Sequence, residues 1–220
     1  MRRYSSDPMP TPGTSYESRT NDDGQRRSMA PGELAAWLQE RVPRLHELWT
    51  EEIRIRAVGQ HHDVARIMGR FVDQLTHMLP HLLGPLRGQV RPLWDRACEL
   101  FGVVAAKRGL AAGEVIEEFH VLRELVIREL YKYPPHGGRR PLSLPETLRL
   151  NRALDRAVTH ASVGHTDAMF YDLLERDGGA PAPTNGSMTH EAEAQLALIG
   201  EELERILALH AQRGNGGRGG

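Results

Sequence analysis

The chain has few of the residues that stabilise small secreted proteins or fill strand-rich cores. Cys98 is the only cysteine among 220 residues, so no intramolecular disulfide can form and a thiolate-based metal site is out of reach. Aromatic residues make up 5% of the chain, and the core therefore has to be built from Leu, Val, Ile, Ala and Met. This composition favours helices, because strands usually draw on aromatic and β-branched residues.

Long apolar runs and an excess of one charge are also missing. No stretch approaches the roughly 18 apolar residues that a membrane span requires, and Arg2 and Arg3 are not followed by the apolar segment of a secretory signal. The formal net charge is −1 with both signs interleaved, which gives no electrostatic footprint for nucleic acid. We therefore expect a cytoplasmic protein that binds neither nucleic acid nor membranes.

Lysine is nearly absent as well, occurring only at Lys107 and Lys132, while arginine is abundant. This bias is typical of GC-rich codon usage and indicates a bacterial source. Because lysine and arginine carry the same charge, the bias by itself predicts no binding function.

The local composition and the apolar pattern divide the chain into five parts. Residues 1–30 are rich in Ser, Pro, Thr and Gly without apolar periodicity, so we expect a disordered tail. Residues 31–176 repeat apolar positions three to four apart between Gly and Pro breaks, which predicts a helical bundle. We expect a flexible linker at 177–187, a further helix at 188–212 and a disordered glycine-rich end at 213–220.

The apolar pattern also predicts the fold class. Long amphipathic helices joined by short turns, without sustained period-two alternation, pack best as an antiparallel bundle. We predict an all-α protein: an antiparallel bundle of four to five helices plus a separate C-terminal amphipathic helix. The clearest apolar stripe, expected on a helix at about 112–131, is formed by Val115, Phe119, Leu122, Val126 and Leu130. In the helix expected to end near 174, the inward positions are Leu144, Leu148, Leu154, Val158, Ala161 and Met169.

The predicted C-terminal helix has a spacing of its own. Its apolar residues alternate four and three apart, which is a heptad seam: Ala192, Leu196, Ile199, Leu203 and Ile206. About two heptads are too short for a stable coiled coil alone, so the helix must pack on the bundle, on its copy in a dimer, or on a partner. We assign Leu196, Ile199, Leu203 and Ile206 to a partner or dimer interface and expect a homodimer.

Residues 113–123 carry a Gly, then an aromatic, two variable residues and Leu-Arg, and residues 150–157 carry Asn-x-x-Leu-Asp-x-Ala. Both segments resemble the RsbRD N-terminal domain family, the input domains of stressosome proteins that antagonise the kinase RsbT. The motif positions are Phe119, Leu122, Arg123, Asn151, Leu154 and Asp155. A tryptophan in an early helix, Trp37 or Trp49, also fits, and the likeness covers roughly residues 34–173.

The resemblance implies a sensory or regulatory domain for the stress response. Family members precede phosphoacceptor domains or histidine-kinase transmitters, and neither follows here. This departure favours a stand-alone signal-transduction regulator that acts through protein–protein interaction. The expected partner is a signalling protein: a kinase, a phosphoacceptor-domain protein or a response regulator.

The start of the C-terminal helix supports an alternative function. Residues 188–200 are similar to the phosphoacceptor helix of histidine kinases, with His190-Glu191 followed by Leu and Ile at the expected offsets, but without the usual Arg and Pro. His190 is therefore a candidate phosphoacceptor in a histidine phosphotransfer protein. The competing interpretation is that His-Glu simply opens an ordinary helix.

Other histidines suggest a third function. His77 and His81 lie four apart on one helix, a spacing that lets two imidazoles share a metal or haem, although no cofactor is firmly predicted. A small-ligand or haem sensor with a pocket inside the bundle is the corresponding hypothesis. His120 and His165 fall near apolar stripes, where a histidine serves either as a pH switch or as a hydrogen-bonded interior residue.

The remaining candidates favour structure over catalysis. Arg123 and Asp155 are placed to pair across the bundle, and Cys98 lies in an apolar setting typical of inert packing. The sequence contains no Gly-rich phosphate loop, no Gly-x-Ser-x-Gly elbow and no paired catalytic carboxylates with a supporting base. We therefore expect a protein that is not an enzyme.

Overall fold

The computed structural model of the chain describes residues 32–56, 62–135, 144–178 and 185–216. This part of the chain forms six helices: α1 (Glu33–Arg56), α2 (His62–Leu83), α3 (Arg87–Lys107), α4 (Ala112–Lys132), α5 (Leu144–Gly178) and α6 (Asn185–Gly216). No strand occurs within these ranges, which confirms the all-α fold class. None of the six helices contains an apolar stretch long enough to cross a bilayer. The predicted tail, residues 1–30, lies outside the described residues.

Three helix ends near the C-terminus differ from those expected. α5 continues to Gly178 and α6 begins at Asn185, so both helices extend into the predicted linker. α6 also runs on to Gly216, four residues beyond its predicted end. Composition alone does not fix where a helix begins or ends.

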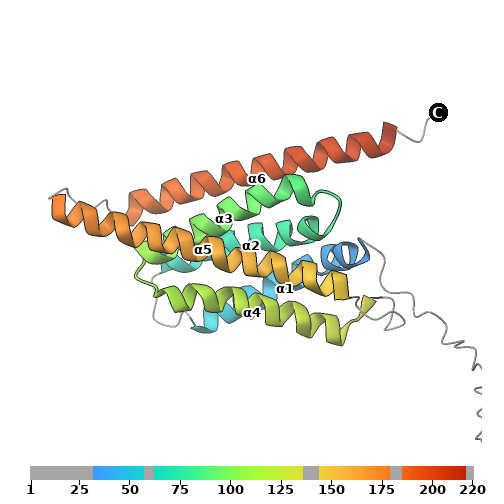
Figure 1. Ribbon diagram of the computed structural model, residues 1–220, viewed down its shortest axis with the longest axis horizontal. Coiled ribbons are helices and arrows are strands. Elements are labelled where there is room, and N and C mark those ends of the chain that lie inside the picture. Colours follow the sequence, from blue (N-terminus) through green and yellow to red (C-terminus); the bar gives the residue numbers. More distant parts are fainter. Residues whose placement is uncertain (1–31, 57–61, 136–143, 179–184, 217–220) are drawn as a thin grey trace, which may run out of the picture.

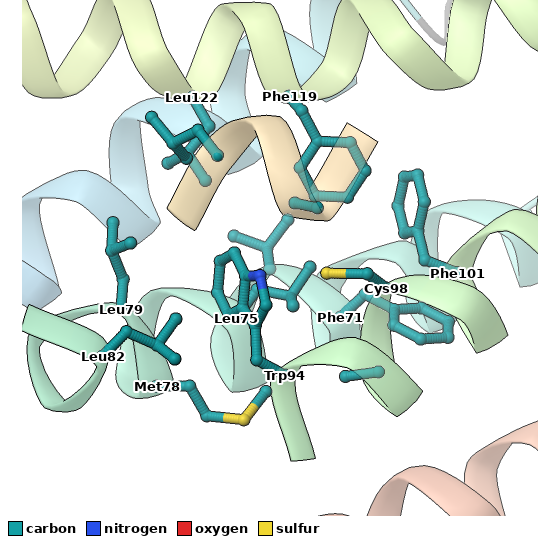
Figure 2. Close-up of a cluster of buried hydrophobic side chains, with 14 of the residues drawn as sticks. Phe71, Leu75, Met78, Leu79, Leu82, Trp94, Cys98, Phe101, Phe119 and Leu122 are labelled. Carbon is teal, nitrogen blue, oxygen red and sulfur yellow. The ribbon is translucent and has the colours of Figure 1, made fainter. Parts of the chain in front are cut away.

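Aromatic rings from four helices meet at the centre of the bundle. The rings of Phe71 (α2) and Phe101 (α3) meet edge to face at 5.5 Å, and Phe119 (α4) stands 5.2 Å from Phe101. Trp49 of α1 extends the cluster, with its ring 6.3 Å from that of Phe119. Figure 2 shows these phenylalanines beside Trp94, surrounded by leucines and Met78 from α2. One aromatic cluster therefore joins four helices, and aliphatic side chains fill the rest of the core.

α3 and α5 make the closest contact in the bundle. A Cβ atom added at Gly102 would lie 1.9 Å from the carbonyl oxygen of Ala161, and one at Gly164 would lie 2.0 Å from the carbonyl oxygen of Glu99. Backbone therefore meets backbone at this crossing, and only glycine fits at both positions. The α5 residues that face α3 are correspondingly small and fully buried, Ala157 and Ala161 among them.

The two helices run in the same direction. Their contacts pair Asp95 with Arg156, Gly102 with Ala161, and the turn residue Leu110 with His165, so the residue numbers rise together on both sides. α4 lies between them in the sequence and returns antiparallel to both, as Figure 1 shows. The up-down-up course of α3, α4 and α5 explains why the first and third of these helices are parallel neighbours.

The inward face of α5 is therefore not the predicted one. Leu154 and Ala161 are fully buried and Val158 is partly buried, as expected, but Leu144, Leu148 and Met169 are 69%, 43% and 46% exposed. The expectation failed because the buried stripe of α5 passes through other positions: Glu146, Leu150, Leu154, Ala157, Ala161, His165 and Ala168. The stripe predicted on α4 is confirmed: Val115, Phe119, Leu122 and Val126 are buried, and Leu130 packs against them.

α6 packs on the bundle, lengthwise along α3 and α2 (Figure 1). The seam residues Ala192, Leu196, Ile199 and Leu203 are buried, and Ile206 is partly buried against the same core. This corrects the assignment of Leu196, Ile199, Leu203 and Ile206 to a partner or dimer interface, because α2 and α3 of the same chain already cover the seam. Ion pairs at its edges join Arg66 to Glu193 at 2.8 Å and Arg96 to Glu202 at 2.5 Å.

The α3–α5 crossing predicts a strong effect of a single methyl group. Replacing Gly102 with Ala, or Gly164 with Ala, should lower the free energy of unfolding by about 3 kcal/mol, because the backbone oxygen of the facing helix has to move. Urea unfolding followed by circular dichroism measures the loss.

Gly69 of α2 is the matched control, since nothing lies within 4 Å of a Cβ added there. Gly69→Ala should raise the stability by about 0.5–1 kcal/mol, as expected for Gly to Ala inside a helix. A Gly102→Ala protein as stable as the Gly69→Ala protein would contradict the close crossing.

Candidate functional site

The two helices that carry the motif positions singled out in the sequence lie side by side. The guanidinium of Arg123 (α4) donates a hydrogen bond to the carboxylate of Asp155 (α5), which confirms the pair expected from the sequence. Asn151, one turn before Asp155, is half-buried. The apolar motif residues are all in the core: Phe119, Leu122 and Leu154. The pair fixes the register of the two helices. It adds little stability, because the carboxylate of Asp155 is largely exposed.

A cavity of about 350 Å³ lies beside the first motif helix. Ile53 and Met68 line it together with Glu118, whose carboxylate accepts hydrogen bonds from Trp49 Nε1 at 3.4 Å and from Arg56 Nη2 at 2.9 Å. Burial raises the pKa of Glu118, and the Arg56 charge and the two hydrogen bonds oppose that rise. A half-buried carboxylate at a cavity wall suits a ligand with a hydrogen-bond donor or a positive charge.

The histidine pair predicted as a metal or haem site lies where α2 meets α6. The rings of His77 and His81 are 5.8 Å apart, and His77 Nε2 lies 3.5 Å from the Glu204 carboxylate of α6. Within the described ranges, no group of three or more His, Cys, Asp or Glu side chains is arranged to hold a metal ion. Burial lowers the pKa of His81; the positive charges of His77 and His210 add to this, and Glu204 opposes it. The pair therefore belongs to the contact between two helices.

The other two singled-out histidines have opposite environments. His165 is buried, and its Nε2 lies 2.8 Å from the carbonyl oxygen of Leu110, so it ties α5 to the turn after α3. It is the hydrogen-bonded interior histidine that the sequence suggested. His120 is exposed on α4, with its Nδ1 3.9 Å from Glu117, so the expectation that it lies against the core is wrong. The core-facing stripe passes through Phe119, and the next residue turns to solvent.

Cys98 and His190 lie at opposite extremes of exposure. Cys98 is fully buried, and burial raises the pKa of its thiol well above the ordinary value, as expected for inert packing. His190 is exposed near the start of α6, and Glu191 beside it is exposed as well. A phosphodonor could therefore reach the imidazole of His190 without any movement of the bundle.

The end of α5 carries an exposed apolar surface that the sequence analysis did not single out. Buried residues on α5 stop at Ala168, and the helix continues past the other helices at one end of the bundle (Figure 1). Five of the next six residues are apolar, with only Asp172 between them, and they are 46–63% exposed. We call them the distal α5 surface: Met169, Phe170, Tyr171, Leu173 and Leu174. The signal in the sequence was apolar residues on every side of a helix, where a core helix has one apolar face.

Comparison of the chain with protein-family models, with curated proteins and with solved structures finds no match.

The histidine pair predicts that stability falls in mild acid. Above pH 6.5, the ordinary value for histidine, His81 is neutral in the folded and the unfolded chain. As the pH falls below 6.5, the unfolded chain takes up a proton that folded His81 resists, so stability decreases until the pH passes the lowered folded pKa. Unfolding free energies measured by urea at about pH 7.5 and about pH 5.5 should show the loss.

Two variants identify His81 as the source. His81→Gln should reduce the acid loss, while Glu204→Gln should enlarge it, because Glu204 is the group that holds the pKa of His81 up. His120→Gln, an exposed histidine on α4, should leave the loss unchanged. If the three variants lose equal stability between the two pH values, the contact between α2 and α6 is not the acid-sensitive one.

Proposed function

We propose that this protein is a bacterial, cytoplasmic signal-transduction regulator that acts by binding another protein rather than by catalysis. The observation that carries the proposal is the distal α5 surface. Contiguous exposed apolar side chains on a protein usually mark a surface that binds another molecule. Single exposed leucines scattered over the surface would carry no such meaning, but here five exposed apolar residues lie within six consecutive positions.

The composition of this surface supports a protein partner. Phe170 and Tyr171 are 58% and 63% exposed, and aromatic residues are enriched at the energetic centres of protein interfaces. A helix end that projects from a bundle can enter a groove on a partner or pack between two of its helices. The resemblance of α4 and α5 to stressosome input domains suggests a signalling protein: a kinase, a phosphoacceptor-domain protein or a response regulator. A second copy of the chain, forming a homodimer, would use the same surface.

Disrupting the distal α5 surface should separate binding from folding. Phe170→Asp combined with Leu174→Asp should weaken partner binding or self-association by at least about thirtyfold, because an apolar anchor at the centre of an interface contributes ~2 kcal/mol or more. Stability should change little, since both side chains are exposed. Sedimentation velocity measures self-association, and affinity capture from the source bacterium followed by mass spectrometry measures partner binding.

Ile127→Asp combined with Tyr131→Asp is the matched control, because these exposed residues lie on α4 away from the end of α5. The control pair should keep wild-type binding. Equal behaviour of the two double variants in both assays would rule out the distal α5 surface as the interface.

A second function, phosphotransfer through His190, is favoured by the exposure of that side chain on α6. If it operates, incubation with phosphoramidate should produce an acid-labile, base-stable phosphate that His190→Gln removes. His210→Gln, an exposed histidine on the same helix, should keep the phosphate. Equal labelling of both variants would exclude His190 as the acceptor.

A third function, sensing of a small ligand, is favoured by the cavity beside Glu118. Neither His77 nor His81 lines this cavity, so a metal or haem bound by these two histidines is not favoured there. Native mass spectrometry of the freshly purified chain would detect a retained ligand directly.

A further inference from the structure

A second cavity, of about 300 Å³, lies between the first halves of α3 and α5. Five arginines line it, two from α3 and three from α5: Arg87, Arg91, Arg149, Arg152 and Arg156. We propose that this cavity binds a small molecule that carries phosphate groups with two or more negative charges. The inference does not depend on the protein-binding function, because the cavity and the distal α5 surface lie on different parts of α5.

Two of the five arginines already have carboxylate partners. Arg149 pairs with the buried Glu146 at 2.6 Å, and Arg156 holds Asp95 through its Nε and Nη2 atoms. His160 also approaches Asp95, at 3.5 Å. These two pairs neutralise one positive charge each and hold the two guanidinium groups in place.

The other three arginines leave a surplus of positive charge. In the described parts of the chain, no ion pair joins Arg87, Arg91 or Arg152 to a carboxylate. The first turn of α3, where Arg87 lies, contains no acidic residue either. Because α3 and α5 are parallel, the positive N-terminal ends of both helices lie at this end of the bundle and add to the potential.

Helical spacing explains how the arginines converge. Arg87 and Arg91 are four apart on α3, and Arg149, Arg152 and Arg156 are three and four apart on α5, so each set shares one face. Like charges at these spacings destabilise a helix by a few tenths of a kcal/mol per pair, and the parallel register brings the two rows together. An anion bound in the cavity would attract the arginines of both helices and so offset their mutual repulsion.

The chemistry of the lining selects the class of ligand. Guanidinium groups offer planar pairs of N–H donors that match the oxygens of phosphate. Leu82, Trp94 and Ala153 form the apolar part of the lining, which suits the uncharged remainder of a small organic phosphate. Three unpaired guanidinium groups call for more than one negative charge, so a diphosphate fits the site better than a single carboxylate.

Inorganic pyrophosphate is the probe for a direct test. Isothermal titration of the full chain should show saturable binding at one site, together with a rise in Tm. Arg91→Gln combined with Arg152→Gln should weaken binding by about one hundredfold, since each charge-assisted contact contributes about tenfold or more. Arg91→Lys combined with Arg152→Lys should recover only part of the loss, because lysine keeps the charge but lacks the planar donor pair.

Arg70→Gln combined with Arg205→Gln is the matched control. Both arginines are exposed, lie outside the cavity and form no ion pair within the described ranges, so the net charge changes equally. The control should bind pyrophosphate within about twofold of the wild type, because only distant charges are removed. Circular dichroism without ligand should show the Gln variants folded, since the substitutions relieve like-charge repulsion.

Three outcomes would overturn the proposal. The first is no heat and no change in Tm with pyrophosphate up to millimolar concentration. The second is equal weakening in the cavity and control variants, which would show binding by overall charge. The third is binding of heparin, sensitive to Arg91 and Arg152, without binding of pyrophosphate, which would make the arginines a surface for extended polyanions.

Discussion

The backbone contact between α3 and α5 determines much of the structure. At Gly102 and Gly164 the two helices approach so closely that a single Cβ would overlap a carbonyl oxygen. The contact fixes the depth and the register of α5, and the residues at the crossing itself, Ala161 and Gly164, must then be small. It also places His165 where its ring reaches the carbonyl oxygen of Leu110, between α3 and α4. The arginine-lined cavity and the exposed end of α5 both follow from this one placement.

Much of the fold could be predicted from the sequence because it depends on local periodicity. The stripe through Phe119 and Leu122 predicted the buried face of α4, and the motif positions predicted the pairing of Arg123 with Asp155. The inward face of α5 could not be predicted in the same way. Leu144 offers more apolar area than Ala157, but the stripe that faces the core passes through Leu150, Leu154 and Ala157 and leaves Leu144 outside it.

The candidate sites were harder to predict for a different reason. A heptad seam shows that a helix will bury Leu196 and Leu203, but it does not distinguish a surface of the same chain from that of a partner. Likewise, Arg91 and Arg152 are sixty-one residues apart, and only the parallel course of α3 and α5 brings them to one cavity. The distal α5 surface is visible in the sequence as apolar residues, but its exposure depends on where the neighbouring helices end.

The length of α5 has a mechanical consequence. α5 is a continuous helix of 35 residues, and it is clamped near its middle by the glycine contact with α3. On the N-terminal side of this contact, Leu150 and Leu154 are buried in the core, so this half of α5 is held in place as well. Arg152 and Phe170 lie about 27 Å apart along the helix at 1.5 Å per residue. α5 therefore sets a fixed spacing between the arginine-lined cavity and the distal α5 surface.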